Sequence, residues 1–252
     1  MAQTGDLLES SPHRALKTNI VDSSLIQVIT IYALPVVFAI TLHEAAHGYV
    51  AKRLGDLTAY AAGRVSLNPL RHIDPIGTIA LPLALLALSK LLGSSGILFG
   101  WAKPVPVNFA NLRRPRADVL FVAAAGPLSN LAMAALWAAV LKIGLMLPVA
   151  YIAMPLSLMG AAGIFVNVIF AVLNLLPLPP LDGGRMLMTI LPRRIAYNVA
   201  RIEPYGFIAL IALLVLGMLG PLLWPPIRFI VSLIEAAAML PPGVVFRLAS
   251  AV

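Results

Sequence analysis

Long apolar segments separated by short polar connections dominate the pattern of hydrophobic and polar positions along the chain. Five apolar runs stand out, and a weaker sixth follows them: 24–51, 76–92, 118–147, 152–176 and 205–224, then 227–240. A helix needs about 20 apolar residues to cross the hydrocarbon core of a bilayer, and several of these runs are that long. The pattern predicts an all-α polytopic membrane protein.

The same pattern divides the chain into three parts. Residues 1–23 are polar and mixed in charge, and we expect a polar N-terminal tail there. The runs within 24–224 form a membrane-embedded core, and 225–252 form an amphipathic or membrane-associated C-terminal segment. The first run carries the ionisable motif described below, so it is not a cleaved signal peptide.

Basic residues in the connections orient this core. Lys and Arg residues cluster in three connections: 52–75, 93–117 and 185–201. The link at 148–152 contains neither, so the positive-inside rule places the three clusters in the cytoplasm and this link outside. The first helix then runs inward. Because 76–92 has both ends in the cytoplasm and contains Pro82, we expect a re-entrant or interfacial segment, with a full crossing as the alternative.

Composition agrees with a membrane setting. The chain is 60% hydrophobic and 11% charged, whereas about 25% of the residues in ordinary soluble domains are charged. The formal net charge of +8 lies mostly in the connections, where it orients a membrane protein, and we expect no nucleic-acid binding. The chain has no cysteine, so any zinc must be held by His and carboxylate groups.

A His-Glu-x-x-His motif lies at the end of the first apolar run, where LHEAAH contains His43, Glu44 and His47. Two histidines four positions apart project from one face of a helix, so both imidazoles can bind one Zn²⁺ while Glu44 points at the metal's water. The basic residues after the motif mark the membrane surface, and at 1.5 Å per residue the site lies roughly 10 Å below it. A pair of core histidines is the alternative, but the cost of burying ionisable groups in hydrocarbon makes a functional site the default.

A catalytic zinc site needs a third protein ligand, and Asp182 is the candidate. It follows the fourth apolar run in NLLPLPPLDGGR, where three prolines exclude a regular helix. Irregular backbone at membrane depth is tolerated where it is buried in protein or lines a water-filled cavity. Asp182 could instead cap a helix over 183–191. Because the two-histidine site lacks a ligand, we favour coordination of one Zn²⁺ per chain by His43, His47 and Asp182.

Three motifs together resemble the site-2 protease family of intramembrane zinc metalloproteases: LHEAAHGYVAKRLGD, AAGPLSN and NLLPLPPLDGGR. GRVSLNP and GWAKPVPVN are similar to the short bacterial and archaeal members, and the resemblance covers about 40–192. It implies a site-2 protease-like transmembrane core in which the same three ligands hold zinc, Glu44 is the catalytic acid/base, and Asn174 holds the substrate or stabilises the oxyanion. The sequence contains neither a PDZ nor a CBS domain, so we expect a short form with a separate regulatory partner.

The resemblance predicts a zinc-dependent endopeptidase that hydrolyses peptide bonds in or near transmembrane segments of membrane proteins. Such a bond is shielded by the hydrogen bonds of its own helix, so the substrate must unwind locally. GRVSLNP, with alternating Val65 and Leu67, is either an edge strand after the first helix that pairs with an extended substrate, or a plain surface hairpin. We expect a multi-pass protein of a prokaryotic inner membrane with its active site toward the cytoplasm.

Several alternatives remain at this level. A non-catalytic zinc-binding scaffold or transporter would also use the histidines, and a protease of the prenyl-protein processing type would take Glu203 or Glu235 as third ligand. His72 and Asp74 fit polar loop residues better than a second metal site. Three small polar residues either line the active site or form hydrogen bonds between helices: Ser129, Asn130 and Asn167.

Overall fold

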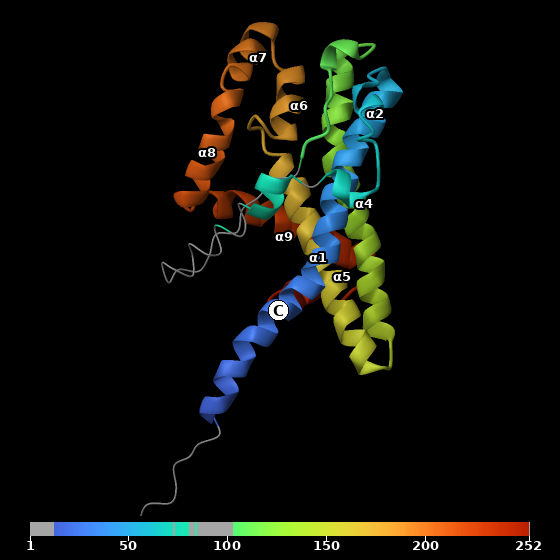
Figure 1. Ribbon diagram of the computed structural model, residues 1–252, viewed down its shortest axis with the longest axis vertical. Coiled ribbons are helices and arrows are strands. Elements are labelled where there is room, and N and C mark those ends of the chain that lie inside the picture. Colours follow the sequence, from blue (N-terminus) through green and yellow to red (C-terminus); the bar gives the residue numbers. More distant parts are fainter. Residues whose placement is uncertain (1–12, 73, 81–83, 85–102, 252) are drawn as a thin grey trace, which may run out of the picture.

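The computed structural model of the protein describes residues 13–72, 74–80, 84 and 103–251. Every regular element in these residues is helical (Figure 1), which confirms the all-α fold. The long helices are α1 (His13–Leu54), α4 (Pro115–Met146), α5 (Ala150–Asn174) and α9 (Leu219–Ala237). Shorter elements connect them: α2 (Thr58–Ala61), η1 (Pro69–Arg71), η2 (Pro75–Ala80), η3 (Phe109–Asn111), α6 (Asp182–Ile190), α7 (Arg193–Ala200), α8 (Glu203–Val215) and α10 (Val244–Ala249).

Four helices of the described residues are long and apolar enough to cross a membrane, which makes the chain an integral membrane protein. One is the part of α1 from Ile26 to Leu54, and the other three are the whole of α4, α5 and α9. The first three agree closely with the predicted runs at 24–51, 118–147 and 152–176. Helices α7 and α8 pass the same test only as a pair, and they are bent by 66° where they meet.

The centre of the fold is the packing of α1, α4 and α5. Helices α4 and α5 lie side by side, and α1 crosses them (Figure 1). Gly160 of α5 lies against the backbone of α4, because a Cβ atom built on it would be 2.6 Å from Leu141 N. In a membrane, helices associate through such close packing of small residues. Ala134, Ile164 and Val168 fill the core around this contact.

The C-terminal part differs from the predicted runs. The run at 205–224 does not form one helix, because α8 ends at Val215 and α9 begins at Leu219. Between them Gly217 has φ +68°, a left-handed conformation that most residues avoid. Helix α9 then runs across the bundle (Figure 1) and packs on α5 through Ile227 and Val231.

The segment after α1 tests two further expectations. Residues 63–69 contain no strand: a turn at Gly63 is followed by irregular backbone up to η1, so of the two alternatives for this stretch the edge strand is wrong. The Val65 side chain instead packs against Gly48 of α1. Within 76–92, residues 76–80 belong to η2. Apart from residue 84, the rest lie outside the described residues, so the re-entrant segment remains a prediction.

Buried Asp56 ties the end of α1 to the loop before α4. Its carboxylate accepts hydrogen bonds from the backbone and hydroxyl of Thr58, from Asn108 N and from Asn111 Nδ2. Burial alone would raise the pKa of Asp56, but these hydrogen bonds outweigh it and lower the pKa. The loop is therefore held beside α1, with consequences for the site described below.

We expect Gly160→Ala to destabilise the protein by about 1–3 kcal/mol, the usual cost of forcing an extra carbon into a packed contact. The added methyl group must push Leu141 of α4 away. Thermal unfolding of the purified protein in detergent measures this. Gly220→Ala in α9 is the matched control, because the nearest atom to its Cβ is 3.9 Å away. An unchanged melting temperature for Gly160→Ala would contradict the packing argument.

Candidate metal centre

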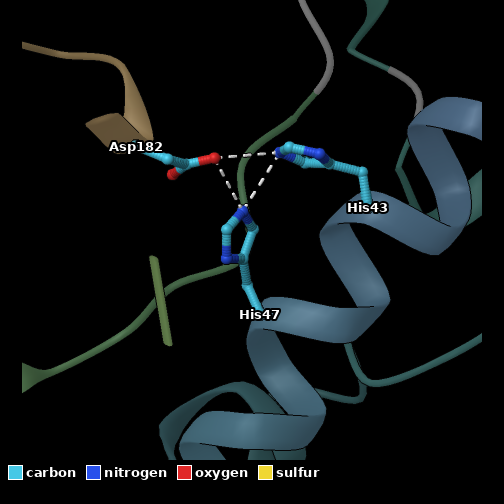
Figure 2. Close-up of side chains that lie close together, drawn as sticks. All are labelled: His43, His47 and Asp182. Carbon is cyan, nitrogen blue, oxygen red and sulfur yellow. Dashed lines mark hydrogen bonds and ion pairs between the residues drawn. The ribbon is translucent and has the colours of Figure 1, made fainter. Parts of the chain in front are cut away.

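Two histidines of α1 and the first residue of α6 point toward one another (Figure 2). His43 Nε2 and His47 Nε2 lie 3.1 Å apart, and each lies 3.2 Å from Oδ2 of Asp182. All three residues are buried. The structure thus brings the three predicted ligands into one group with the spacing of a metal site.

An irregular turn over 175–181 delivers Asp182 to this group. The turn begins where α5 ends, and the next helix, α6, begins at Asp182. Gly183 approaches the turn so closely that a Cβ atom on it would lie 2.3 Å from Leu175 O. The N-cap residue of α6 is Leu181, and no side chain caps the helix, so the alternative role of Asp182 as a helix cap is wrong.

Hydrogen bonds at the far side of each imidazole determine which nitrogen faces the group. His47 Nδ1 lies 2.7 Å from the carbonyl oxygen of Val122, and His43 Nδ1 lies 2.7 Å from Oδ1 of Asn130. Both partners are acceptors, so each Nδ1 carries a proton and each Nε2 of a neutral ring presents a lone pair. Asp182 Oδ2 receives no hydrogen bond from the described residues. With the proton on each Nδ1, the two Nε2 atoms and the carboxylate oxygen can all serve as ligands of one cation.

The spacing and shape of the group fit zinc. In a tetrahedral zinc site with bonds of about 2.0–2.1 Å, neighbouring ligand atoms lie about 3.3–3.4 Å apart, close to the spacing found here. Gly126 of α4 faces the same point, because a Cβ atom on it would lie 2.4 Å from His47 Nε2 and 2.6 Å from His43 Nε2. Any other residue at 126 would fill the place that a metal needs.

A small cavity opens beside the three ligands, and Glu44 lines it. Glu44 Oε2 accepts a hydrogen bond of 2.8 Å from Val105 N. The cavity has a volume of about 170 Å³. Its wall also contains Asn174 and Arg185, and most of the remaining wall is apolar: Pro104, Val105, Val107, Phe109, Val122, Ala123 and Pro180. The cavity therefore offers space for a substrate segment next to a carboxylate and a metal position.

The segment 103–107 forms one wall of this cavity, a role that was not expected from the sequence. Arg64 donates to the carbonyl oxygens of Lys103 and Pro104 at 3.0 and 3.3 Å, and Lys103 N donates to His72 O. Asp56 holds the following residue, Asn108. The alternation of Pro and Val in KPVPV could have indicated a non-helical wall here, because proline favours extended backbone and has no N–H to donate.

Asn130 has a defined place at the site, because its side chain touches His43 directly. Asn167 contacts Asn130 and not the ligands, and Ser129 donates to Gly126 O within its own helix. Of the three residues, therefore, Asn130 touches the site, Asn167 forms a hydrogen bond between helices, and Ser129 bonds within its own helix.

Other candidate ligands have different partners. Glu235 accepts hydrogen bonds from the backbone N–H groups of Gly243 and Val245 at the start of α10. His72 Nε2 lies 2.8 Å from Ser66 O, and Asp74 accepts the backbone N–H groups that begin η2. Among the described residues, the three ligands above are the only group of His and carboxylate residues close enough to share a metal ion.

Comparisons with known proteins agree with this geometry. The sequence model of peptidase family M50 matches residues 142–217, a stretch that includes Asn174 and Asp182. A relative from Bacillus subtilis (strain 168), named "Putative zinc metalloprotease YwhC", is 36% identical over 199 residues, which cover 75% of this chain and 82% of that protein.

Proteins of the same description named Rip2 are more distant. The one from Mycolicibacterium smegmatis is 32% identical over 179 residues, 70% of this chain and 63% of the relative. The one from Mycobacterium tuberculosis (strain H37Rv) is 33% identical over 149 residues, 58% of this chain and 51% of the relative. No solved structure matches the chain significantly.

These similarities decide between the alternatives left by the sequence. They identify a zinc metalloprotease, so the non-catalytic scaffold and the transporter are set aside. The apolar helices and the relatives point to the same class of protein. The chain belongs to peptidase family M50, the site-2 protease family, and it is an integral membrane zinc metalloendopeptidase.

Proposed function

We propose that His43, His47 and Asp182 hold one zinc ion per chain and that the enzyme cleaves peptide bonds in or near transmembrane segments of membrane proteins. The observation that carries this proposal is the convergence of His43 Nε2, His47 Nε2 and Asp182 Oδ2 to within 3.2 Å of one another, at a helix that can span a membrane. His43 and His47 lie about 16 and 10 Å along α1 from its end at Leu54. Hydrolysis would therefore take place below the membrane surface.

Glu44 is the general base and acid in this proposal. A bound zinc ion supplies Lewis acidity that lowers the pKa of a coordinated water toward about 7. Glu44 would accept a proton from the attacking water and return it to the leaving amine. The N–H of Val105 holds the carboxylate toward the cavity, where the water would stand.

Asn174 supports the reaction from the end of α5. Its side-chain nitrogen donates to Phe170 O in its own helix at 3.0 Å. An amide nitrogen has two N–H bonds, so a second donor remains on a residue that lines the cavity. We assign to it the stabilisation of the negative charge that develops on the substrate carbonyl oxygen.

A transmembrane substrate has to unwind before it fits this site. Its peptide bonds are otherwise shielded by helical hydrogen bonds, because the bilayer core offers no other partners. The cavity wall formed by 103–107 has no regular secondary structure, and the residues of it that line the cavity, Pro104, Val105 and Val107, are apolar, which suits an unwound apolar segment. Pro104 and Pro106 have no N–H to donate, and the N–H groups of Lys103 and Val105 already donate to His72 O and Glu44.

The distribution of basic segments supports an orientation with the site toward the cytoplasm. One end of the bundle contains α2, α7 and the N-terminal end of α4 (Figure 1). The connection from α4 to α5 lies at the opposite end. Lys and Arg residues flank α2, precede α4, and lie within and just after α7, whereas the connection 147–152 contains no Lys or Arg. By the positive-inside rule the first end is cytoplasmic, and we place the enzyme in the plasma membrane of a prokaryotic cell.

Asp182→Ala should remove most of the zinc from the purified protein, because it leaves only two ligands for a catalytic site that needs three. Metal content measured by atomic spectroscopy tests this. Asp74→Ala and Glu203→Ala serve as controls and should retain their zinc, since neither residue belongs to the ligand group. Full zinc occupancy in Asp182→Ala would refute the ligand assignment.

Glu44→Gln should retain zinc and lose cleavage, since the carboxylate transfers protons and does not bind the metal. Asn174→Ala should also retain zinc but slow cleavage by roughly 10²-fold, as when one oxyanion donor is removed. Single-turnover cleavage of a model transmembrane substrate measures both. A native rate for Asn174→Ala would reduce that residue to a packing role, and a native rate for Glu44→Gln would disprove the acid/base assignment.

Single cysteines introduced into this cysteine-free chain test the orientation. Cysteines at Arg64, Arg114 and Arg194 should react with a membrane-impermeant maleimide only after permeabilisation, whereas one at Pro148 should react in intact cells. Labelling of 64 and 114 from opposite sides would show that the segment between them crosses the membrane, and the predicted re-entrant segment would then be wrong.

A further inference from the structure

A chain of buried amide groups connects His43 to the backbone of α5. Asn130 of α4 and Asn167 of α5 are both 0% exposed. Asn130 Oδ1 lies 2.7 Å from His43 Nδ1, and Asn130 Nδ2 donates to Ala39 O at 3.1 Å and to Asn167 Oδ1 at 3.0 Å. Asn167 Nδ2 donates to Gly163 O at 2.9 Å. The chain thus contacts α1, α4 and α5.

Backbone carbonyl groups determine the direction of every hydrogen bond in this chain. Gly163 O can only accept, so the nitrogen of Asn167 must face it and Asn167 Oδ1 must face Asn130. The nitrogen of Asn130 then serves both Asn167 Oδ1 and Ala39 O. Oδ1 of Asn130 is left for His43, whose Nδ1 must carry the proton. Turning either amide around would set two acceptors against each other.

We propose that Asn167, together with Asn130, is a positioning residue that holds His43 in the tautomer able to bind metal. This inference rests on the proposed function, because it takes His43 Nε2 as a zinc ligand. Without an acceptor at Nδ1, the ring can carry its proton on Nε2 instead, where it blocks coordination. Outer partners of this kind typically contribute 10–100-fold to metal affinity.

The two zinc-binding histidines differ in this respect. His47 donates directly to a backbone carbonyl, Val122 O, which no side-chain substitution removes. His43 depends on two side chains instead. Among the outer hydrogen-bond partners of the two histidines, substitutions that weaken the metal centre should therefore fall on Asn130 and Asn167, although Asn167 does not touch His43.

The test measures zinc affinity of the full-length protein in detergent by competition with a chelator. Asn130→Leu should weaken zinc binding by about 10–100-fold and Asn167→Leu by about 10-fold. Asn167→Asp should stay within about threefold of the native affinity, because a buried carboxylic acid is neutral. Its O–H can donate to Gly163 O while its carbonyl accepts from Asn130.

A second measurement reports the tautomer itself. In the zinc-free protein labelled with ¹⁵N-histidine, His43 should show a protonated Nδ1, and Asn167→Leu should shift the ring toward protonation at Nε2. If Asn167→Leu fails to fold, the smaller Asn167→Ala replaces it in both measurements. An unchanged His43 spectrum in the variant would overturn the inference.

Gly160→Ala separates positioning from packing. It loosens the contact between α4 and α5 without touching the amide chain, so it should lower the melting temperature and leave zinc affinity unchanged. Native affinity in Asn167→Leu, or an equal loss in Gly160→Ala, would overturn the inference while leaving the proposed function intact. Full zinc retention in Asp182→Ala would overturn the proposed function instead.

Discussion

The close approach of three polar atoms, one each from His43, His47 and Asp182, is the constraint on which the structure depends. Two imidazole nitrogens and a carboxylate oxygen lie 3.1–3.2 Å apart in a buried place. In a medium that screens poorly, an ion shared by these atoms stabilises the group strongly. In the proposed function this ion is zinc, and the surrounding helices keep the three atoms in place. The site is therefore one in which folding and metal binding are coupled.

Polar groups inside this apolar bundle are placed so that nearly every one has a defined partner. His47 and His43 use their outer nitrogens for hydrogen bonds to α4, and the amides of Asn130 and Asn167 bind backbone carbonyls. In a bilayer an unsatisfied group is costly, so each hydrogen bond also restricts the orientation of its neighbour. The same bonds that join the helices therefore determine the chemical state of the ligands.

Two interruptions of regular structure create the cavity. The turn at 175–181 ends α5 and lets α6 present Asp182 to α1, while the segment 103–107 runs beside Glu44. Both are rich in proline, which prevents helix formation. The turn is held by the close backbone approach of Gly183. The segment 103–107 is held by Arg64, which donates to Lys103 O, and by Asp56, which accepts from the N–H of the following residue, Asn108. Irregular backbone here lines a cavity, the setting in which membranes tolerate it.

The sequence by itself determined the membrane class, three of the long helices and the placing of His43 and His47 on one face of a helix, because helical periodicity and hydrophobic length are local properties. It could not decide whether Asp182 caps a helix or faces the histidines, since both roles suit an aspartate before a helical run. Only the tertiary structure resolved this, and it shows a turn and irregular backbone at 63–69, where an edge strand was one of two alternatives. The contacts of Val105 and Asn130 join residues far apart in the chain, and such contacts arise only when α1, α4 and α5 pack together.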